Sequence, residues 1–189
     1  MLVECGFVRV TLADGAEFTF TPSFKNIAAL GSPGEIVRLF VDLHGPKAVE
    51  AARYILTVLS DQEDPTPAVG WLSLEDGEWK SGAIADKEQV FIARHLMKYG
   101  IVGHAKPGTK PDAKKQEGEY SSEFKALEYI SAARVHLGLS AEDAAALSMA
   151  EFQMMFEMKF PESERSGRNV PSRDEYRKFM ESLKERKNG

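Results

Sequence analysis

The sequence predicts a mainly helical α+β protein, with an N-terminal β-hairpin followed by a helical domain, a mobile linker and a small C-terminal helical unit. Apolar and polar residues alternate clearly only near the N-terminus, as in a half-buried strand, whereas apolar residues recur at helical spacing through most of the remaining chain. One internal stretch has no large apolar side chain at all. The expected organisation is therefore a hairpin plus helical domain, a linker, a three-helix unit and a partly helical tail, over residues 1–102, 103–119, 120–160 and 161–189.

The hairpin is expected near the start of the chain. Side chains alternate from Phe7 to Leu12 and resume the alternation from Phe18 to Phe20. Between these runs lies Asp14-Gly15, a pair that favours tight hairpin turns.

Helical spacing begins at residue 24, and a first helical turn over 24–30 is expected to stop at Gly31. Ser32, Pro33 and Glu35 then combine a capping box with proline at the first helical position, which predicts a helix that ends before Gly45. Residues 47–60 carry a broad apolar face and predict a helix that is buried on two sides.

The stretch from 61 to 102 is less regular. Residues 61–67 predict a polar loop, and residues 69–80, with Asp76-Gly77 between two tryptophans, fit either a short second hairpin or an irregular loop. Asp86 begins a helix that we expect to close at Gly100, with the next two residues folding back past the glycine.

Residues 103–119 contain prolines, glycines and charges without a large apolar residue, which is typical of a mobile linker. Beyond it, Ser121 or Ser122 is expected to cap a helix that ends at Gly138.

Two further helix starts follow within eight positions. Ser140 with Asp143 predicts a short second helix, and Ser148 with Glu151 predicts a third. The chain must therefore turn twice, and the three helices form a compact corner. Its outline resembles a DNA-binding helix-turn-helix, but the third helix has two acids and no basic residue before Lys159, which argues against phosphate contacts.

Composition restricts the classes of function. The charged share of 28% and the hydrophobic share of 43% are those of a globular protein, and no apolar run is long enough to cross a membrane. With a single cysteine and no secretory signal, the protein is expected in the cytoplasm. The net charge is −5, yet residues from Lys159 onward carry nine Lys/Arg against six Asp/Glu. This tail either binds an acidic partner or is a solvated helix of mixed charge; no basic surface that would bind nucleic acid is expected elsewhere.

No catalytic, cofactor-binding or metal-binding pattern is present. The sequence lacks a phosphate-binding glycine loop, a nucleophile elbow and a metalloprotease motif, and its four histidines are scattered singly. We therefore expect a protein that is not an enzyme and needs no cofactor.

The candidate partner-binding site lies on the third helix of the small unit, which is apolar nearly all round. Two interpretations stay open. The apolar residues form the core of the unit against Leu127, Ile130 and Leu147, or part of the methionine face is left for a partner helix. The candidate residues are Met149, Phe152, Met154, Met155, Phe156 and Met158.

Three stretches resemble a family of proteins encoded in the tail module of long-tailed bacteriophages, which includes tail assembly chaperones. They are residues 20–37, residues 93–103, and the ordered elements from Ala132 to Pro161 that include Gly-Leu-Ser-x-x-Asp-Ala, Met-x-Glu-Phe and Lys-Phe-Pro. The resemblance covers most of residues 18–161. It implies a non-enzymatic protein of the host cytoplasm that binds the long helical tape-measure protein and helps tail-tube subunits to assemble around it, with homo-oligomers as a further option. The alternative is a minor structural component that is retained in the virion.

Overall fold

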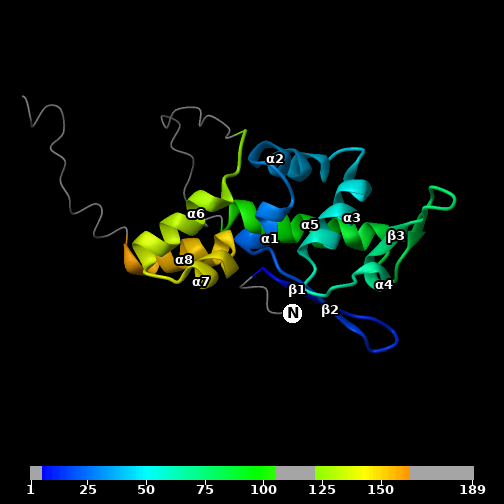
Figure 1. Cartoon of the computed structure of the whole chain (residues 1–189), viewed down its shortest axis with the longest axis horizontal. Helices are drawn as coiled ribbons and strands as arrows, with labels where there is room; N and C mark the ends of the chain where they lie inside the picture. Colours follow the sequence, from blue (N-terminus) through cyan, green and yellow to red (C-terminus); the bar gives the residue numbers. More distant parts are fainter. Residues whose placement is uncertain (1–5, 105–121, 162–189) are drawn as a thin grey trace, which may run out of the picture. The chain divides into compact units, whose positions relative to one another are not determined.

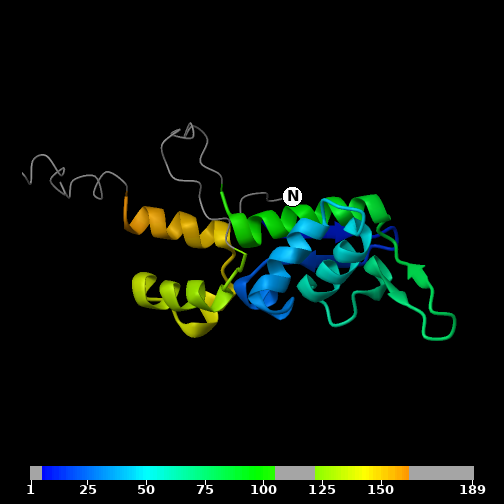
Figure 2. The ribbon, with the colours of Figure 1, turned by 90° about the horizontal axis from the view of Figure 1, so that it is seen from above.

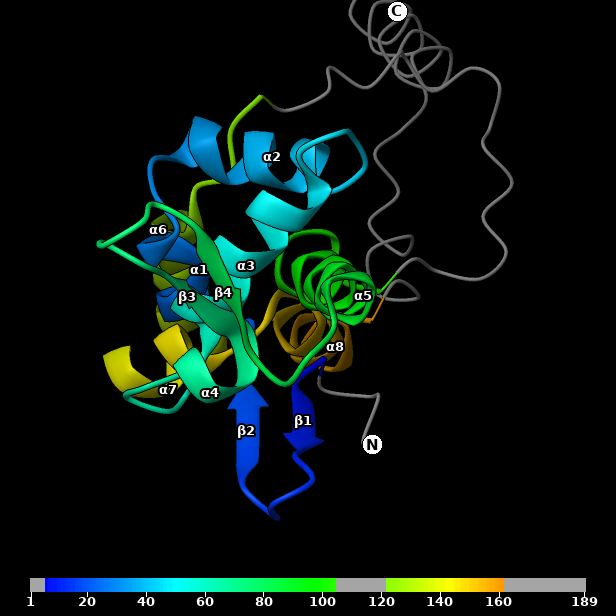
Figure 3. The ribbon, with the colours of Figure 1, turned by 90° about the vertical axis from the view of Figure 1, so that its right-hand side faces the viewer.

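The computed structural model describes residues 6–104 and 122–161. The chain divides into two compact units, residues 1–156 and 157–189. Within the described residues the first unit contains short helices and two separate two-stranded antiparallel sheets (Figures 1 and 3). This confirms the expected mainly helical α+β class.

The N-terminal hairpin forms as predicted. Strands β1 (Val8–Thr11) and β2 (Glu17–Phe20) pair in antiparallel register, with Val8 opposite Phe20 and Val10 opposite Phe18. Gly15 adopts a positive φ of 87° in the turn, which glycine tolerates without strain. Phe18 and Phe20 are buried, so one face of the hairpin enters the core.

Helices α1 (Phe24–Ala29) and α2 (Pro33–Asp42) begin after Ser23 and Ser32, and only the cap at Ser32 was expected. The Ser32 backbone N–H donates to the Glu35 carboxylate at 2.8 Å, which is half of the predicted capping box. At the other end of α2, the Arg94 guanidinium donates twice to the Leu43 carbonyl, at 2.9 and 2.7 Å. These bonds occupy a carbonyl that the helix end leaves without an intrahelical partner.

Helix α3 (Ala48–Leu59) packs along α5 (Asp86–Met97) to form the centre of the unit. The end of α3 is joined to the first hairpin, because the Thr21 N–H donates to the Leu59 carbonyl at 2.9 Å. The fully buried side chains of this core are aromatic and aliphatic, among them Phe20, Phe24, Ile27, Ile55, Leu56, Leu59, Leu96 and Met97.

The region that the sequence left undecided is a second hairpin. Strands β3 (Gly70–Leu72) and β4 (Trp79–Ser81) pair with Leu72 opposite Trp79. A short helix, α4 (Thr66–Val69), precedes it where only a loop was expected. The Gln89 side chain is fully buried and donates to the Val69 and Ile84 carbonyls at 2.9 and 2.8 Å, and so fixes the base of the hairpin to α5.

The predicted helix end at Gly100 is wrong. Helix α5 continues into a π-helical turn, η1 (Lys98–Val102), and the chain leaves it at Gly103, whose φ is 79°. Gly100 serves a different purpose, because a Cβ there would lie 2.9 Å from the Ile27 side chain. The glycine therefore permits close packing of η1 on α1 and does not reverse the chain.

The last described helices are α6 (Ala126–Ala132) with the π-helical turn η2 (Ala133–Leu137), α7 (Ala141–Ala146) and α8 (Met149–Lys159). The prediction that Ser121 or Ser122 caps the first of them is wrong, because α6 begins only after Lys125. The Phe124 N–H donates instead to the Pro33 carbonyl at 2.9 Å, which fixes this segment against the start of α2. The predicted end at Gly138 is confirmed by its left-handed conformation.

Helices α6 and α7 pack against α1, although the sequence assigned them to a separate unit. The Phe24 ring stacks on Tyr129 with centroids 5.6 Å apart, and the Phe24 N–H donates to the Leu147 carbonyl at 2.8 Å. Because of these contacts, residues 122–156 belong to the same compact unit as the N-terminal helices. The boundary between the two compact units therefore lies after residue 156, whereas the sequence placed the end of the first domain at residue 102. Most of the expected linker and all but the first residue of the expected tail lie outside the described residues and stay predictions.

Candidate partner-binding site

Helix α8 is held at its N-terminus by the capping box that the sequence predicted. The Ser148 N–H donates to the Glu151 carboxylate at 2.8 Å, and the Glu151 N–H donates to the Ser148 hydroxyl oxygen at 3.2 Å. Ser140 caps α7 in a similar way, because its hydroxyl accepts from the Asp143 N–H at 3.0 Å. Each pair satisfies backbone groups that have no intrahelical partner, which allows the chain to begin two helices in close succession.

An aromatic cluster fixes one side of α8. Phe152 meets Tyr129 edge to face with centroids 5.7 Å apart, and Tyr129 stacks between Phe24 and Phe124 at 5.6 and 5.3 Å. Phe156 extends the cluster, 5.6 Å from Phe152. Contacts of this kind add to the area that aromatic rings bury, so the first two turns of α8 are firmly anchored.

The side chain of Gln153, the residue after Phe152, joins α8 to the end of η1 by hydrogen bonds. The Gln153 carboxamide accepts from the His104 N–H at 2.9 Å and donates to the Val102 carbonyl at 3.1 Å. A Cβ at Gly103 would overlap this carboxamide, so the close approach requires glycine there. Gln153 was not predicted as a contact residue, because a single neutral side chain carries no spacing pattern.

The six candidate residues separate into buried, intermediate and exposed groups. Met149 and Phe152 are in the core, which agrees with the first of the two interpretations: Phe152 is only 8% exposed and its ring is covered by Phe24 and Tyr129. Met155 and Phe156 are half-buried. Met154 is 44% exposed and Met158 is 78% exposed.

We call Met154 and Met158 the α8 methionine surface. Four residues apart, they lie one above the other on one face of the helix. The packing partners that the sequence suggested hold only in part: Ile130 and Leu147 are partly buried against the core, but Leu127 is exposed and contributes nothing to it.

This arrangement offers an apolar contact surface. Among residues 6–104 and 122–161, no group of three or more His, Cys, Asp or Glu side chains is placed to hold a metal ion. The helices of the same residues are all too short or too polar to cross a bilayer.

The fold and the exposed helix define a mainly helical α+β protein whose last described helix is anchored on one side and presents methionines on another. The chain belongs to DUF6246, a family of unknown function, which matches residues 44–178. No curated protein and no solved structure matches the chain. The matched region includes α8 and the β3–β4 hairpin, so both lie within the part that defines the family.

Proposed function

We propose that this protein is a tail assembly chaperone of a long-tailed bacteriophage, a non-enzymatic protein of the host cytoplasm that binds the tape-measure protein and aids assembly of the tail tube around it. The observation that carries the proposal is the α8 methionine surface, together with the resemblance of residues 20–37, 93–103 and 132–161 to that family.

The chemistry of the surface suits a helical partner. Met154 and Met158 are one helical turn apart, which matches the spacing of apolar side chains along one face of an amphipathic helix. Unbranched thioether side chains adapt to varied apolar shapes, so a single surface can follow successive turns of a long helix. This is the property that a chaperone of an extended helical protein requires.

The anchoring of α8 also favours binding. The capping box at Ser148 and the packing of Phe152 hold the first turns of the helix before any partner arrives. The partner therefore does not have to order the helix from a disordered segment, which reduces the entropic cost of association.

The test is co-expression of the full chain with the tape-measure protein of the same phage, followed by affinity capture. Met154→Asp and Met158→Asp are expected to abolish capture while circular dichroism and the melting temperature stay close to wild type, because both side chains are exposed. Val41→Asp is the matched control, since Val41 is an exposed aliphatic residue on α2, and it is expected to leave capture intact.

Capture that survives both methionine substitutions would contradict the proposal, and so would unfolding of both variants. Mass spectrometry of purified particles separates the chaperone from the alternative. A chaperone is absent from the finished virion, whereas a minor structural component is retained in it.

A further inference from the structure

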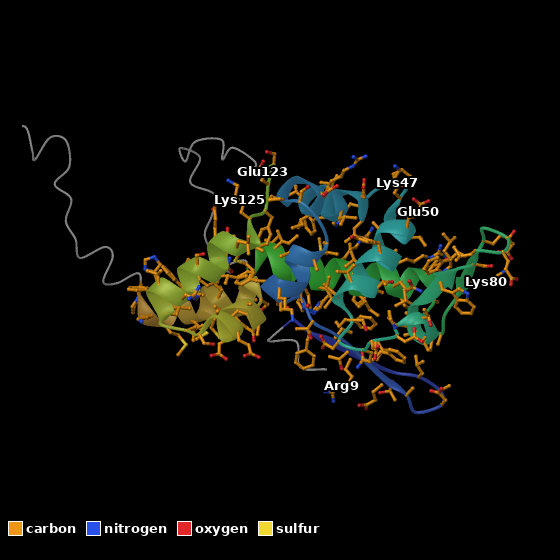
Figure 4. The ribbon with its side chains drawn as sticks, viewed as in Figure 1. Arg9, Lys47, Glu50, Lys80, Glu123 and Lys125 are labelled. Carbon is orange, nitrogen blue, oxygen red and sulfur yellow. The ribbon has the colours of Figure 1, made fainter. Side chains whose placement is uncertain are left out.

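The β3–β4 hairpin carries a second exposed apolar surface. Leu74 at its tip is 97% exposed and Trp71 is 49% exposed, and Leu72 between them is exposed as well. With Ser73, Glu75 and Lys80 they line a shallow hollow of about 600 Å³, formed entirely by the hairpin. Figure 4 shows Lys80 on this hairpin. An apolar residue that is exposed singly needs no explanation, but neighbouring exposed apolar residues form a patch of the kind that marks a contact site.

The base of the hairpin is fixed, although its tip is exposed. The Arg53 guanidinium lies 4.5 Å from the centroid of the Trp79 ring and pairs with the Asp86 carboxylate at 2.9 Å. Gly70 and Gly82 allow the strands to pass close to each other, because a Cβ on Gly82 would lie 2.6 Å from the Gly70 nitrogen. The second tryptophan of the hairpin thus holds the base, and Trp71 is left at the surface.

The charge around the hollow is negative. Glu75, Asp76 and Glu78 surround the tip, and the Lys80 ammonium lies 2.6 Å from the Asp76 carboxylate and 3.9 Å from that of Glu78. The hydrogen bond from Lys80, with help from the Glu78 N–H, lowers the pKa of Asp76 to about 2, so this carboxylate stays ionised well into the acidic range. Three acids and one base leave a net negative charge beside an exposed indole and two leucines.

The negative charge and the apolar side chains of the hollow indicate which kind of ligand can bind there. A nucleic acid or an anionic lipid surface would be repelled, and a second copy of the hairpin would bring like charges together. A lysine or arginine fits, because its aliphatic stem can lie along Leu72 and Leu74 while its charge approaches Glu75 and the face of Trp71. We propose that the hairpin hollow binds a segment of a partner protein in which a lysine or arginine stands next to a large apolar side chain.

The hairpin hollow is a surface that the proposed chaperone function does not use. In Figures 1 and 2 the hairpin lies at one end of the first compact unit, and α6 and α7 lie at the other end. The hairpin hollow and α8 share no residue, so each surface can be disabled without changing the other.

The experiment is selection of a displayed library of random nonapeptides on the full-length protein, followed by fluorescence anisotropy with the selected peptides. The selected sequences are expected to be enriched in lysine or arginine beside large apolar residues. Trp71→Ala, Leu74→Ser and Glu75→Lys are each expected to weaken binding about tenfold or more, as for residues at the centre of an interface. Glu50→Lys makes the same change of net charge at an exposed position near the start of α3 (Figure 4) and is expected to change affinity less than about twofold.

Three outcomes would overturn the inference: no enrichment of basic residues, binding that survives both Trp71→Ala and Leu74→Ser, or equal losses for Glu75→Lys and Glu50→Lys. Leu74 is nearly fully exposed, so Leu74→Ser tests the surface even if Trp71→Ala disturbs the fold. Met154→Asp is expected to leave the selection unchanged, so failure of the hairpin site and failure of the chaperone proposal give different results.

Discussion

Phe152 is the residue that joins α8 most directly to the rest of its unit. Its ring centroid lies 6.0 Å from that of Phe24 and 5.7 Å from that of Tyr129, and its side chain is almost fully buried. We expect Phe152→Ala to lower the free energy of unfolding by about 3–5 kcal/mol, because truncation removes the buried area and leaves a cavity. Urea denaturation followed by circular dichroism measures the change.

Met154→Ala is the matched control for that substitution. Met154 is two residues further along the same helix and exposed, so its truncation is expected to cost less than about 1 kcal/mol. Equal losses for the two variants would show that α8 is packed differently from the structure described above.

The roles of single residues could be predicted where they depend on neighbours in the sequence, but not where they depend on contacts with distant segments. The caps at Ser32, Ser140 and Ser148 were predictable, because a cap depends on residues three positions apart. Gly100 was misread, because the close approach of Ile27 that requires a glycine comes from a distant segment. The sequence could not separate Met149 from Met154 either, because the polar residues of α8 are spread around the helix and leave no single polar face that would identify the buried side.

At the scale of the element, the start of α8 depends on its cap. We expect Ser148→Ala to destabilise the protein by about 1 kcal/mol, because the Glu151 N–H loses the hydroxyl oxygen that accepts from it. Ser131 in α6 provides the comparison, since its exposed hydroxyl donates only to the Leu127 carbonyl in the same helix. Ser131→Ala is expected to be neutral or slightly stabilising by thermal denaturation, because alanine favours the helix.

The base of the β3–β4 hairpin gives a second prediction at this scale. A Cβ at Gly82 would lie 2.5 Å from the Ala68 carbonyl oxygen, so Gly82→Ala must displace backbone and is expected to cost about 1–3 kcal/mol. Thermal denaturation measures the loss, and tryptophan emission, to which both Trp71 and Trp79 contribute, reports on the hairpin. Gly34→Ala in α2 is the control: the nearest atom to its Cβ would be 3.8 Å away, and alanine is expected to be tolerated or to stabilise the helix. A Gly82→Ala variant as stable as wild type would show that the strands can separate without loss.

At the scale of the whole molecule, the packing of α1 against α6 could not be predicted from the sequence. Phe24 and Tyr129 lie on opposite sides of the expected linker, and no periodic pattern connects them. The class of fold was predictable, because hairpin alternation and helical spacing are local. The grouping of helices into one compact unit depends on which aromatic rings meet, and a single sequence does not record that.

The pH dependence of stability is a property of the whole molecule to which His95 contributes. Burial lowers the pKa of His95 from its ordinary value of 6.5, and the charge of Lys98 lowers it further. The unfolded chain therefore binds more protons than the folded one between the ordinary pKa and the lowered pKa. The stability that depends on neutral His95 is complete above the ordinary value and is lost as the pH falls through this interval.

We expect His95→Gln to flatten the dependence of the free energy of unfolding on pH between about pH 7.5 and pH 5, because the only group removed titrates there. Urea denaturation at several pH values measures the slope, and Met154→Ala, which changes no titratable group, should keep the wild-type slope. The carboxylates of Glu35, Asp64 and Asp76, whose pKa values are lowered by hydrogen bonds from Ser32, Thr66 and Lys80, respectively, lose their contribution only at more acidic pH. A His95→Gln variant with an unchanged slope across the near-neutral range would show that burial of this imidazole does not couple its protonation to folding.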